Sequence, residues 1–593
     1  MNRWRTDNPW GYILAAVSVL LVAAGSIQFI AQRLIGKLAG VALARLTPFE
    51  YVGLWGAVTP ASRYGLPAWN MGHWAVVLIL STLLLAVVTV TIVLLRRRGR
   101  NPELLKGLAP VGDVIKHAGR KQLMRRAHSL RPLLSNPKPE DVGFLIATYR
   151  GTEVWVSIED PIILVGPSRS GKGFYFIIEM IMRAPGAVVT TSCKVDNVKL
   201  TLGVREGTGG AALVFAPGVD SAAGLGHKLR WNPISGCEEH HTLDRRMEAL
   251  IPKDTYGSGT TNGGHWDILG RQLATALFHA AALDGKTVDD VWGWVVNVAR
   301  AHEAHDIISA HPKGLPEHAA RLSSVLTADP EKRDTSWATL ATVLSWMGSR
   351  SVREWLKPDA GHNFDIPEFL LTRGTLFMIG NEDGTGGYQQ VVGALVQEID
   401  YVAEGIAAAM PGSRLDPSVS FILDEAANFH LASLPKLISA GGGVGRQVVA
   451  VFQSRSQMSA WGPGNDRAMW DAAAVKIVLP GGADEQDLRG LSALVGETTE
   501  KRLSFSESDR GGTSSWSEQE KSILTGSAIR TMPKGTALIF HREMKPIVGR
   551  LSSWLQLKDA KTMQGAEREL STALQDQSQY AQLVRDHIAR QSK

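Results

Sequence analysis

Residues 161–173 read Pro161-Ile-Ile-Leu-Val-Gly-Pro-Ser-Arg-Ser-Gly-Lys-Gly173, an apolar strand that runs into a glycine-rich turn. The mostly apolar stretch from 174 to 182 follows and predicts a helix. The turn has P-loop spacing: its glycines let successive backbone N–H groups point at one phosphate, and its lysine adds charge near the β- and γ-phosphates. The positive N-terminal end of the helix faces the same anion. The stretch therefore predicts a nucleotide site built from Gly166, Pro167, Ser168, Arg169, Ser170, Gly171, Lys172 and Gly173.

The last position of this loop departs from the general P-loop pattern. Gly173 stands where the pattern has serine or threonine, so the hydroxyl usually offered to magnesium is missing. Ser168, Ser170, a water molecule or a distant carboxylate would then have to help hold the metal. A glycine-rich connection that binds nothing is the alternative interpretation. The order of strand, lysine and helix favours the nucleotide.

Polar residues end two further apolar strands downstream. In Ser418-Val-Ser-Phe-Ile-Leu-Asp424-Glu425, Asp424 is placed to hold magnesium and Glu425 to orient or polarise an attacking water, which predicts hydrolysis of ATP. The strand 447–453 ends in Gln453, at the sheet edge that faces the ligand in open α/β sheets. Gln453 could therefore sense the γ-phosphate. The alternatives are two surface acids at a solvated strand end and a glutamine that caps its strand.

Two uncharged runs near the N-terminus, about 11–32 and 74–95, are each long enough to cross a hydrocarbon core of about 30 Å as helices. The alternatives are buried core helices or, for the first run, a cleaved signal peptide. Lys and Arg concentrate on the cytoplasmic side of spans. We therefore predict a hairpin over 1–100 with both termini in the cytoplasm and 33–73 outside, although that loop is itself basic. The flanking residues used are Arg3, Arg5, Arg96, Arg97, Arg98 and Arg100.

Composition excludes several classes of protein. The chain has 593 residues, enough for about four domains, with 44% hydrophobic and 20% charged residues, which rules out collagen, wholesale disorder and a polytopic transporter. The net charge of +6 is compatible with nucleic acid or an anionic membrane but too small to indicate either. The only cysteines, Cys193 and Cys237, form no CxxC pair, so a disulfide framework and a cysteine zinc site are excluded.

The pattern between the motifs predicts an α/β fold, a mainly parallel RecA-like nucleotide domain in two parts, 141–236 and 372–557. A helical pattern over 237–371 lies between them, with Ile268, Leu269, Leu273, Leu277 and Phe278 at helical spacing. The basic linker 101–140 touches anionic lipid or is simply solvated. Residues 504–520 predict an exposed loop. The tail 558–593 predicts a polar helix of mixed charge, which is either an interaction arm or a disordered end. The strands expected are 144–148, 154–158, 187–191, 211–215, 375–379, 475–479 and 537–541.

Taken together in order, these motifs resemble the type IV secretion coupling proteins, the TraG/TraD-like conjugative DNA-transfer ATPases. The likeness also includes Ala187-Val-Val-Thr-Thr-Ser-Cys-Lys-Val-Asp196, Arg230-Trp-Asn-Pro233, Gly374-Thr-Leu-Phe-Met-Ile-Gly380 and Met532-Pro-Lys-Gly-Thr-Ala-Leu538. It implies a P-loop ATPase with ATP and Mg²⁺ as cofactors, anchored in the inner membrane as a multi-pass protein and assembled as a homo-hexamer. It also implies that 237–371 is an inserted all-α domain that helps select substrate.

One departure from that family concerns a charge supplied in trans. Members commonly have a glycine-arginine turn before the sensor strand, and its arginine is thought to reach the neighbouring subunit's nucleotide. Here the turn reads Gly441-Gly-Gly-Val-Gly-Arg446, with Val444 at the expected arginine position. Arg446 is the expected substitute. The alternatives are a loop arginine in solvent, or a trans charge that comes from elsewhere in the chain.

The resemblance implies a membrane-anchored motor that hydrolyses ATP to deliver DNA, or a relaxase–DNA complex, into a type IV secretion channel. No base-reading motif is visible, so the grip on DNA is expected to use phosphate charge without regard to sequence. The alternatives are an adaptor that recruits protein substrates and uses ATP as a switch, and a septal-type pump of double-stranded DNA. A catalytically silent scaffold is disfavoured by Lys172, Asp424 and Glu425.

Overall fold

The fold is described from a computed structural model of the chain. It describes residues 9–43, 46–98, 107–219, 222, 224–251, 263–358, 363–380, 388–429, 431–508, 511–577, 582–584 and 587. For 9–21, 49, 88, 90–98, 263–267, 500–508 and 511–518 the description covers the backbone alone. The chain divides into two compact units, Met1–Lys106 and Gly107–Lys593, and each is described by itself.

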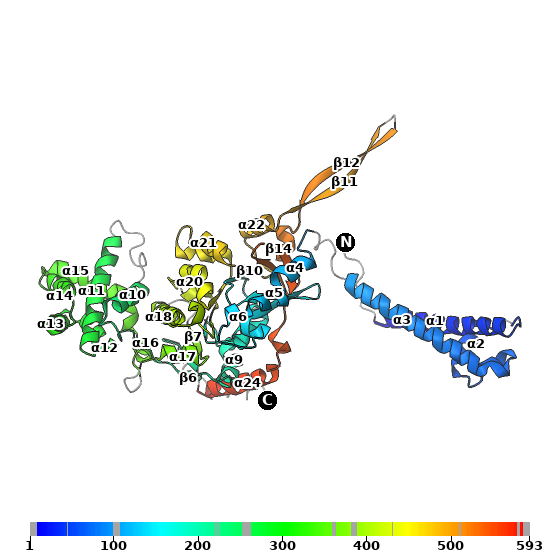
Figure 1. The fold of residues 1–593 in the computed structure, drawn as a ribbon, viewed down its shortest axis with the longest axis horizontal. Coiled ribbons are helices and arrows are strands. Elements are labelled where there is room, and N and C mark those ends of the chain that lie inside the picture. The colour runs from blue at the N-terminus through cyan, green and yellow to red at the C-terminus, as the bar shows by residue number, and fades with distance from the viewer. Residues whose placement is uncertain are drawn as a thin grey trace. The chain divides into compact units, whose positions relative to one another are not determined.

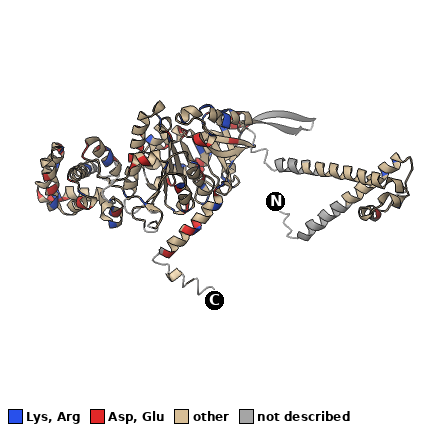
Figure 2. Ribbon diagram, turned by 60° about the horizontal axis from the view of Figure 1, so that its bottom comes forward, with Lys and Arg blue, Asp and Glu red and all other residues tan. Residues whose placement is uncertain are grey.

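The N-terminal unit is built on two long helices that pack against each other, α1 (Pro9–Leu38) and α3 (Asn70–Arg98). Their described parts carry few charged residues (Figure 2). In the described part of the chain, one helical stretch, Pro67–Val87, is long and apolar enough to cross a membrane. The first expected span, 11–32, falls within α1, but its side chains before Val22 lie outside the described residues. The short helices between are α2 (Pro48–Gly53), η1 (Leu54–Gly56), η2 (Pro60–Tyr64) and η3 (Pro67–Trp69).

Buried polar side chains join these two helices near the connecting loop. His73 of α3 pairs through Nε2 with Gln28 Oε1 of α1 at 2.6 Å, and both residues are 0% exposed. Tyr51 donates its hydroxyl to Gln32 Oε1 at 2.6 Å. Polar groups inside an apolar helix pair need such partners. The bond between His73 and Gln28 fixes α3 against α1, and the bond between Tyr51 and Gln32 fixes α2 against α1.

A 12-stranded sheet forms the centre of the second unit (Figure 1). Eight neighbouring strands run parallel, in the order β10-β3-β9-β8-β4-β7-β5-β6, as expected for a nucleotide domain of this class. The expected strands all form, within a residue or two of their predicted ends. The bounds of the eight parallel strands are β3 (Ile162–Val165), β4 (Val188–Ser192), β5 (Ala212–Phe215), β6 (His227–Lys228), β7 (Thr375–Ile379), β8 (Val419–Leu423), β9 (Arg446–Phe452) and β10 (Val475–Val478).

An antiparallel wing continues the sheet beyond β10 and makes it mixed rather than simply parallel. Its strands follow the order β13-β14-β1-β2. One of them, β14, was not expected from the sequence, because Pro546 interrupts its short apolar pattern. The Pro546 carbonyl instead accepts a hydrogen bond from Ala109 N at 3.1 Å. The bounds are β1 (Gly143–Tyr149), β2 (Thr152–Ser157), β13 (Thr536–His541) and β14 (Met544–Arg550).

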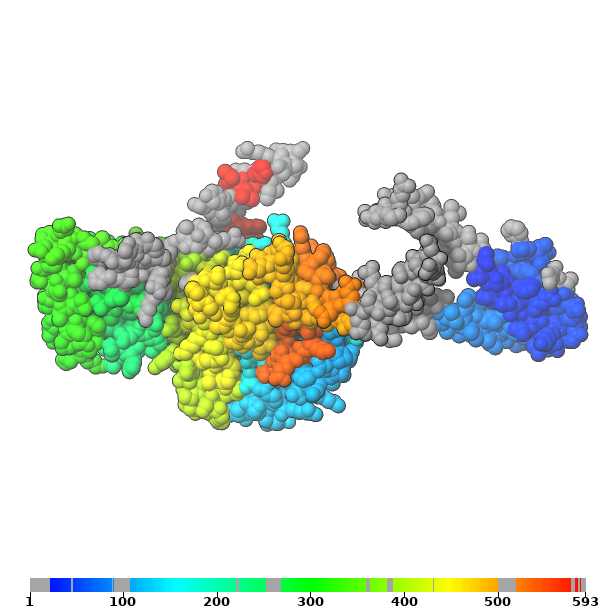
Figure 3. Space-filling view, turned by 90° about the horizontal axis from the view of Figure 1, so that it is seen from above, coloured from blue at the N-terminus to red at the C-terminus, as the bar shows by residue number. Residues whose placement is uncertain are grey.

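Between β6 and β7 the described residues form helices apart from their connections, and these helices make up one end of the second unit (Figures 1 and 3). Leu273, Leu277 and Phe278 are buried, as their spacing predicts, whereas Ile268 is 59% exposed and does not belong to the core. The helices are α10 (His240–Leu250), α11 (Gly263–Leu283), α12 (Val288–Val296), η7 (Val298–Ala301), α13 (His302–Ala310), α14 (Pro316–Leu326), α15 (Pro330–Val343), η8 (Ser345–Gly348), α16 (Arg350–Trp355) and α17 (Ile366–Leu371).

The remaining helices connect the later strands or follow the last one. The helix α18 (Tyr388–Ala409) and the short η10 (Pro411–Ser413) lie between β7 and β8, and the others come after β8. They are α19 (Ala426–Phe429), α20 (Leu434–Ala440), η11 (Gly442–Val444), η12 (Arg455–Trp461), α21 (Asn465–Ala472), α22 (Glu485–Val495), α23 (Gly526–Arg530) and η13 (Trp554–Gln556).

One expectation for the C-terminal third is wrong. Residues 504–520 are not a loop: β11 (Glu497–Ser508) and β12 (Gly511–Ser522) pair as an antiparallel ribbon, whose serine-rich strands hide their β character from a composition argument.

The tail was expected to be a polar helix, and its first half is one. Helix α24 (Ala560–Gln577) packs on α9 (Asp196–Glu206). Met563, 0% exposed, anchors it, and charged residues of both signs lie along the helix.

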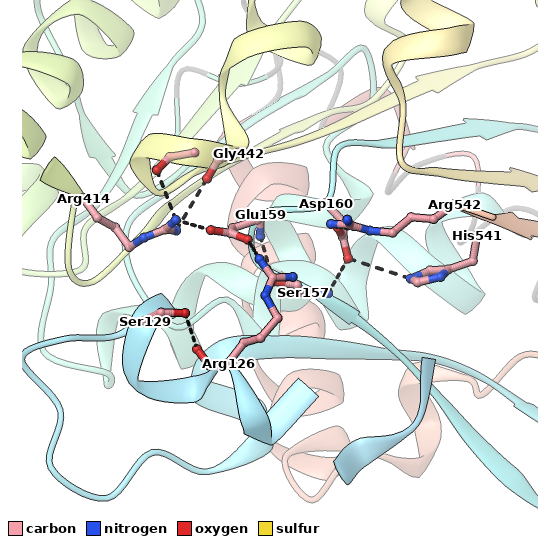
Figure 4. Close-up of polar contacts among 10 residues, drawn as sticks. Arg126, Ser129, Ser157, Glu159, Asp160, Arg414, Gly442, His541 and Arg542 are labelled. Atoms are coloured by element: carbon pink, nitrogen blue, oxygen red, sulfur yellow. Dashed lines mark hydrogen bonds and ion pairs between the residues drawn. The ribbon is translucent and has the colours of Figure 1, made fainter. Parts of the chain in front are cut away.

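The basic segment after the first unit folds onto the sheet rather than forming a solvated linker. Its helices are α4 (Val111–Ala118), α5 (Arg120–Arg125), α6 (Ala127–Leu130) and α7 (Pro139–Val142), and α4 and α5 pack on β2. Figure 4 shows the ion pairs that hold this segment on the sheet. Arg126 pairs with Glu159, which precedes β3 in the chain and also pairs with Arg414. This cluster lies at the edge where the parallel strands begin.

Beside that cluster, Asp160 is a buried carboxylate held by an arginine, a histidine and a backbone donor. It pairs with Arg542 and His541 and accepts from Ser157 N at 2.8 Å (Figure 4). Burial works to raise the pKa of Asp160, but the hydrogen bond from His541 and the charge of Arg542 outweigh it and hold the pKa at about 2. The folded state therefore favours the ionised carboxylate.

We expect Asp160→Asn to lower the free energy of unfolding near pH 7 by about 2 kcal/mol, because a folded pKa of about 2 lies well below the ordinary 3.8. The contribution is complete above about pH 4 and is lost as the pH falls toward 2. Thermal unfolding of the full chain at pH 6 and at pH 3 should show a variant deficit that shrinks with acid. Asp306→Asn, at an exposed aspartate, is the control. A deficit independent of pH would contradict the assignment.

Candidate functional site

The glycine-rich loop leaves β3 at the carboxyl edge of the sheet. All four residues of β3 are buried, and Gly166 N bonds to the carbonyl of Phe452 at 3.0 Å, which joins the loop to the end of β9. Gly171 has φ +90, a backbone conformation that a side chain would strain, so glycine is required there. Lys172 folds back over the loop and donates to the carbonyls of Gly166 and Pro167 at 2.8 and 3.1 Å. The loop leads into a π-helical turn (η5, Gly173–Ile177) and α8 (Ile178–Arg183).

Four neighbouring strands bring the expected site residues to this edge. In the order β3-β9-β8-β4, their ends carry the loop, Gln453, the pair Asp424 and Glu425, and Cys193. Adjacent strands lie about 4.8 Å apart, so Lys172 and the two acids fall within one group about 10 Å wide. Ser168 Oγ lies 3.5 Å from Gln453 Oε1 and bridges the loop to the middle strand. The expected loop, acids and glutamine are therefore brought together.

Two backbone contacts hold the acids. Thr191 of β4 donates its hydroxyl to the carbonyl of Asp424 at 2.8 Å, and Glu425 N donates to Asp424 Oδ1 at 3.0 Å. Glu425 has φ +51, a left-handed conformation that costs energy for a residue with a side chain. The hydrogen bond that Cys193 N donates to the Glu425 carboxylate at 3.3 Å favours this conformation and offsets part of its cost.

Charge and burial act against each other in this site. Burial raises the pKa of Asp424 to about 6, with the Glu425 charge adding to the effect and Lys172 opposing it. Burial likewise lowers the pKa of Lys172, while the charges of Asp424 and Glu425 raise it and Lys194 lowers it. Two close acids and a half-buried lysine therefore make a site that gains from binding a further cation together with an anion.

Three polar groups at the site were assigned no role in the sequence analysis. Burial, together with a hydrogen bond to Glu425, raises the pKa of the Cys193 thiol to about 12, so the thiol stays protonated beside the carboxylate. Asn428 Nδ2 contacts Cys193 Sγ at 3.4 Å. Asn197, at the start of α9, is 7% exposed and faces the loop. A cysteine and two asparagines carry no motif, and only their place in the fold reveals them.

The structure does not support the role expected for Arg446. It begins β9 at the opposite edge of the sheet, about 20 Å of strand away from Gln453. Its side chain is 4% exposed and pairs with Asp400 and, at 3.2 Å, with Glu404. The glycine turn before it is structural, since a Cβ on Gly442 would meet the backbone of Glu159 at 2.1 Å (Figure 4). Arg446 therefore ties β9 to α18, and its buried side chain is engaged by these two acids.

Arg446→Ala should lower the free energy of unfolding by about 3 kcal/mol, because it leaves Asp400 buried without its cation. Burial already raises the pKa of Asp400 against the influence of Arg446. Thermal unfolding should show the loss, Arg446→Lys should recover part of it, and nucleotide affinity should stay unchanged. Unaltered stability, with turnover lost only in the assembled state, would restore the trans role.

A nucleotide with magnesium fits the residues present. Among the described residues, no group of three or more His, Cys, Asp and Glu side chains could hold a metal ion. That part of the chain therefore has no zinc or calcium site built from such side chains alone. Magnesium suits this arrangement because it keeps several waters and takes one or two carboxylates plus substrate phosphates. Asp424 supplies such a carboxylate, and Lys172 lies within its electrostatic range.

The chain has an α/β nucleotide-binding fold with a large mixed sheet. A family model described as type IV secretory system conjugative DNA transfer matches residues 113–577. The chain belongs to this family and is a type IV coupling protein of conjugative DNA transfer.

Solved structures share the fold at low sequence identity. The bacterial conjugative coupling protein TrwBdeltaN70 in its unbound form is 17% identical, with a TM-score of 0.52 over 74% of this chain and 92% of that chain. Plasmid coupling protein TrwB in complex with ADP and Mg²⁺ is 16% identical, with a TM-score of 0.51 over 74% of this chain and 93% of that one. TrwB with a non-hydrolysable ATP analogue is also 16% identical, at a TM-score of 0.50, with the same coverage. No curated protein matches by sequence.

Proposed function

We propose that this coupling protein is a membrane-anchored P-loop ATPase that delivers DNA, or a relaxase–DNA complex, into a type IV secretion channel. The observation that carries the proposal is the convergence of Lys172, Asp424, Glu425 and Gln453 on adjacent strand ends. Structures of TrwB hold ADP with Mg²⁺ and ATP analogues, which supports the same ligands here.

In this proposal the loop residues 166–173 hold the phosphates of ATP. Lys172 exchanges its two loop carbonyls for phosphate oxygens, which match its charge better. Magnesium held by Asp424 would supply charge neutralisation at the phosphates. Glu425 orients and polarises the attacking water, while the Cys193 backbone N–H fixes the direction of its carboxylate. Gln453 lies beside Ser168 and reports the γ-phosphate to β9.

We propose further that α1 and α3 form a two-span hairpin in the inner membrane, with both termini and the ATPase part in the cytoplasm. The arginines on either side of the expected spans support this orientation. The single candidate span of the described residues supports an anchor but does not distinguish one span from two. Accessibility of engineered cysteines in 33–73 to an impermeant reagent would test the hairpin: labelling from the periplasm supports it.

The second unit then works as a homo-hexamer that contacts channel components through its exposed surfaces. We assign 141–236 and 372–557 to the nucleotide domain and 237–371 to the helical domain that helps select substrate. DNA would be gripped through its phosphates, because no base-reading element is present in the sequence.

The decisive experiment measures ATP turnover of the full chain in detergent, with and without single-stranded DNA of mixed sequence. A motor predicts strong stimulation that falls as salt rises. A protein-recruiting adaptor predicts turnover that is indifferent to DNA. Absence of ATP turnover under every condition would overturn the enzymatic proposal itself.

A further inference from the structure

The position that lacks a hydroxyl, Gly173, faces one side chain. A Cβ built on Gly173 would have a single neighbouring atom outside its chain neighbours within 4 Å, the Asn197 Oδ1 oxygen at 3.4 Å. Its backbone is not in the left-handed region, so a side chain could be accommodated there. A P-loop serine or threonine would direct its hydroxyl into this same space. An amide oxygen thus lies beside the place where a hydroxyl oxygen is missing.

The two loop serines that the sequence offered as substitutes point elsewhere. Ser168 is exposed and its Oγ is directed at Gln453 Oε1. Ser170 Oγ lies within the turn, 2.8 Å from where a Cβ on Gly166 would stand, and has no hydrogen-bond partner among the described residues. Neither oxygen is the one that borders Gly173.

Asn197 also reaches the expected metal-binding acid. It follows β4, the strand paired with β8, whose carboxyl end carries Asp424. Burial raises the pKa of Asp424, and the nearby Asn197 side chain works to lower it. The residue is 7% exposed and lies in the first turn of α9, where its backbone carbonyl accepts from the Thr201 hydroxyl at 2.6 Å. One buried carboxamide therefore lies close to both Gly173 and Asp424.

We propose that Asn197 replaces the missing P-loop hydroxyl: its carboxamide oxygen enters the magnesium shell, directly or through one water, and its N–H group orients Asp424. This rests on the proposed function of the loop as an ATP site. Amide oxygens are accepted ligands of hard cations. Asn197, beside Gly173, thus supplies the oxygen that a serine or threonine hydroxyl offers to magnesium in the general P-loop pattern.

The test measures the affinity of the full chain for ADP, by titration calorimetry in detergent, with Mg²⁺ and with EDTA. The magnesium enhancement is the ratio of the two affinities. Asn197→Ala should reduce this enhancement at least about tenfold while leaving affinity in EDTA nearly unchanged, in line with the loss of one group around a metal. Asn197→Ala combined with Gly173→Ser should restore most of the enhancement, because serine returns the oxygen from the other side.

Three controls keep the outcomes separate. Asn297→Ala removes an exposed amide of the helical part that accepts only from Ala299 N, and should keep the enhancement. Equal thermal unfolding midpoints show that each variant folds. If Asn197→Ala does not fold, Asn197→Ser takes its place: it should lose the enhancement by itself and recover it when Gly173→Ser is combined with it. An unchanged enhancement in folded Asn197→Ala overturns the inference. If the unaltered chain fails to bind ADP at all, the proposed ATP site has failed instead.

Discussion

Lys172→Ala is expected to reduce ATP turnover by the full chain at least about 100-fold. Removing one group that stabilises transition-state charge typically has an effect of that size. Its ammonium group is half-buried between two carbonyls and two acids, so no water-exposed cation can replace it. Turnover measured by phosphate release, with the thermal unfolding midpoint recorded in parallel, checks this. Insertion of the N-terminal helices into the membrane should be unaffected.

The matched control is Lys332→Ala, which removes a lysine with an 80% exposed side chain from the helical insert. It should keep turnover within about twofold, since isolated surface charges contribute little. Unaltered turnover in folded Lys172→Ala would refute the assignment of the loop as the site of hydrolysis.

Glu425→Gln should separate binding from chemistry. A glutamine keeps the size of the side chain and can still accept from Cys193 N, so ATP affinity should change by no more than a few-fold. Turnover should fall by about 10²- to 10⁴-fold, the usual contribution of a positioned general base. Binding of a fluorescent ATP analogue and phosphate release, measured on the same preparation, give the two quantities.

Glu485→Gln, on the exposed side of α22, is the control for this substitution, because its carboxylate has 77% exposure and pairs only at the surface with Arg489. The assignment of Glu425 is wrong if the variant loses affinity and turnover in equal proportion. That result would place its role in binding the nucleotide rather than in activating water.

The sequence was sufficient to predict the strands that carry the site and the sheet edge at which the site forms. The apolar runs that end in Gly166, Asp424 and Gln453 are short, bounded and fully buried, and such strands carry their functional residues at one end. Their neighbourhood in the order β3-β9-β8 depends on pairings between distant segments, but the general rule for parallel sheets anticipates it.

The features of the structure that the sequence did not predict depend on contacts between distant segments. The role of Arg446 was misjudged because a glycine-rich turn suggests exposure, whereas Asp400 and Glu404 bury the arginine from more than 40 residues earlier in the chain. The tail was predicted as a polar helix, but its packing was not, because only a few apolar residues of the helix are buried. Ala560 and Met563 pack in one cluster with Trp554 and with Ile178, which belongs to the helix after the loop.

The residues around Asp424 illustrate the same limit within the site. Cys193 lies in a segment, 187–196, that only the resemblance to coupling proteins had singled out, and without a role, and Asn197 is the residue directly after it. Their contacts with Glu425 and Asp424 follow from β4 lying beside β8, a pairing over more than 200 residues of chain.

A density map of the full chain with Mg²⁺ and a non-hydrolysable ATP analogue, obtained by electron cryo-microscopy, tests the central claim most directly. The account predicts phosphate density enclosed by the backbone of 166–173, with Lys172 turned from the loop carbonyls onto it and Asp424 facing the metal. A well-resolved chain at saturating nucleotide, with that loop empty and Lys172 still bonded to Gly166 and Pro167, would contradict it.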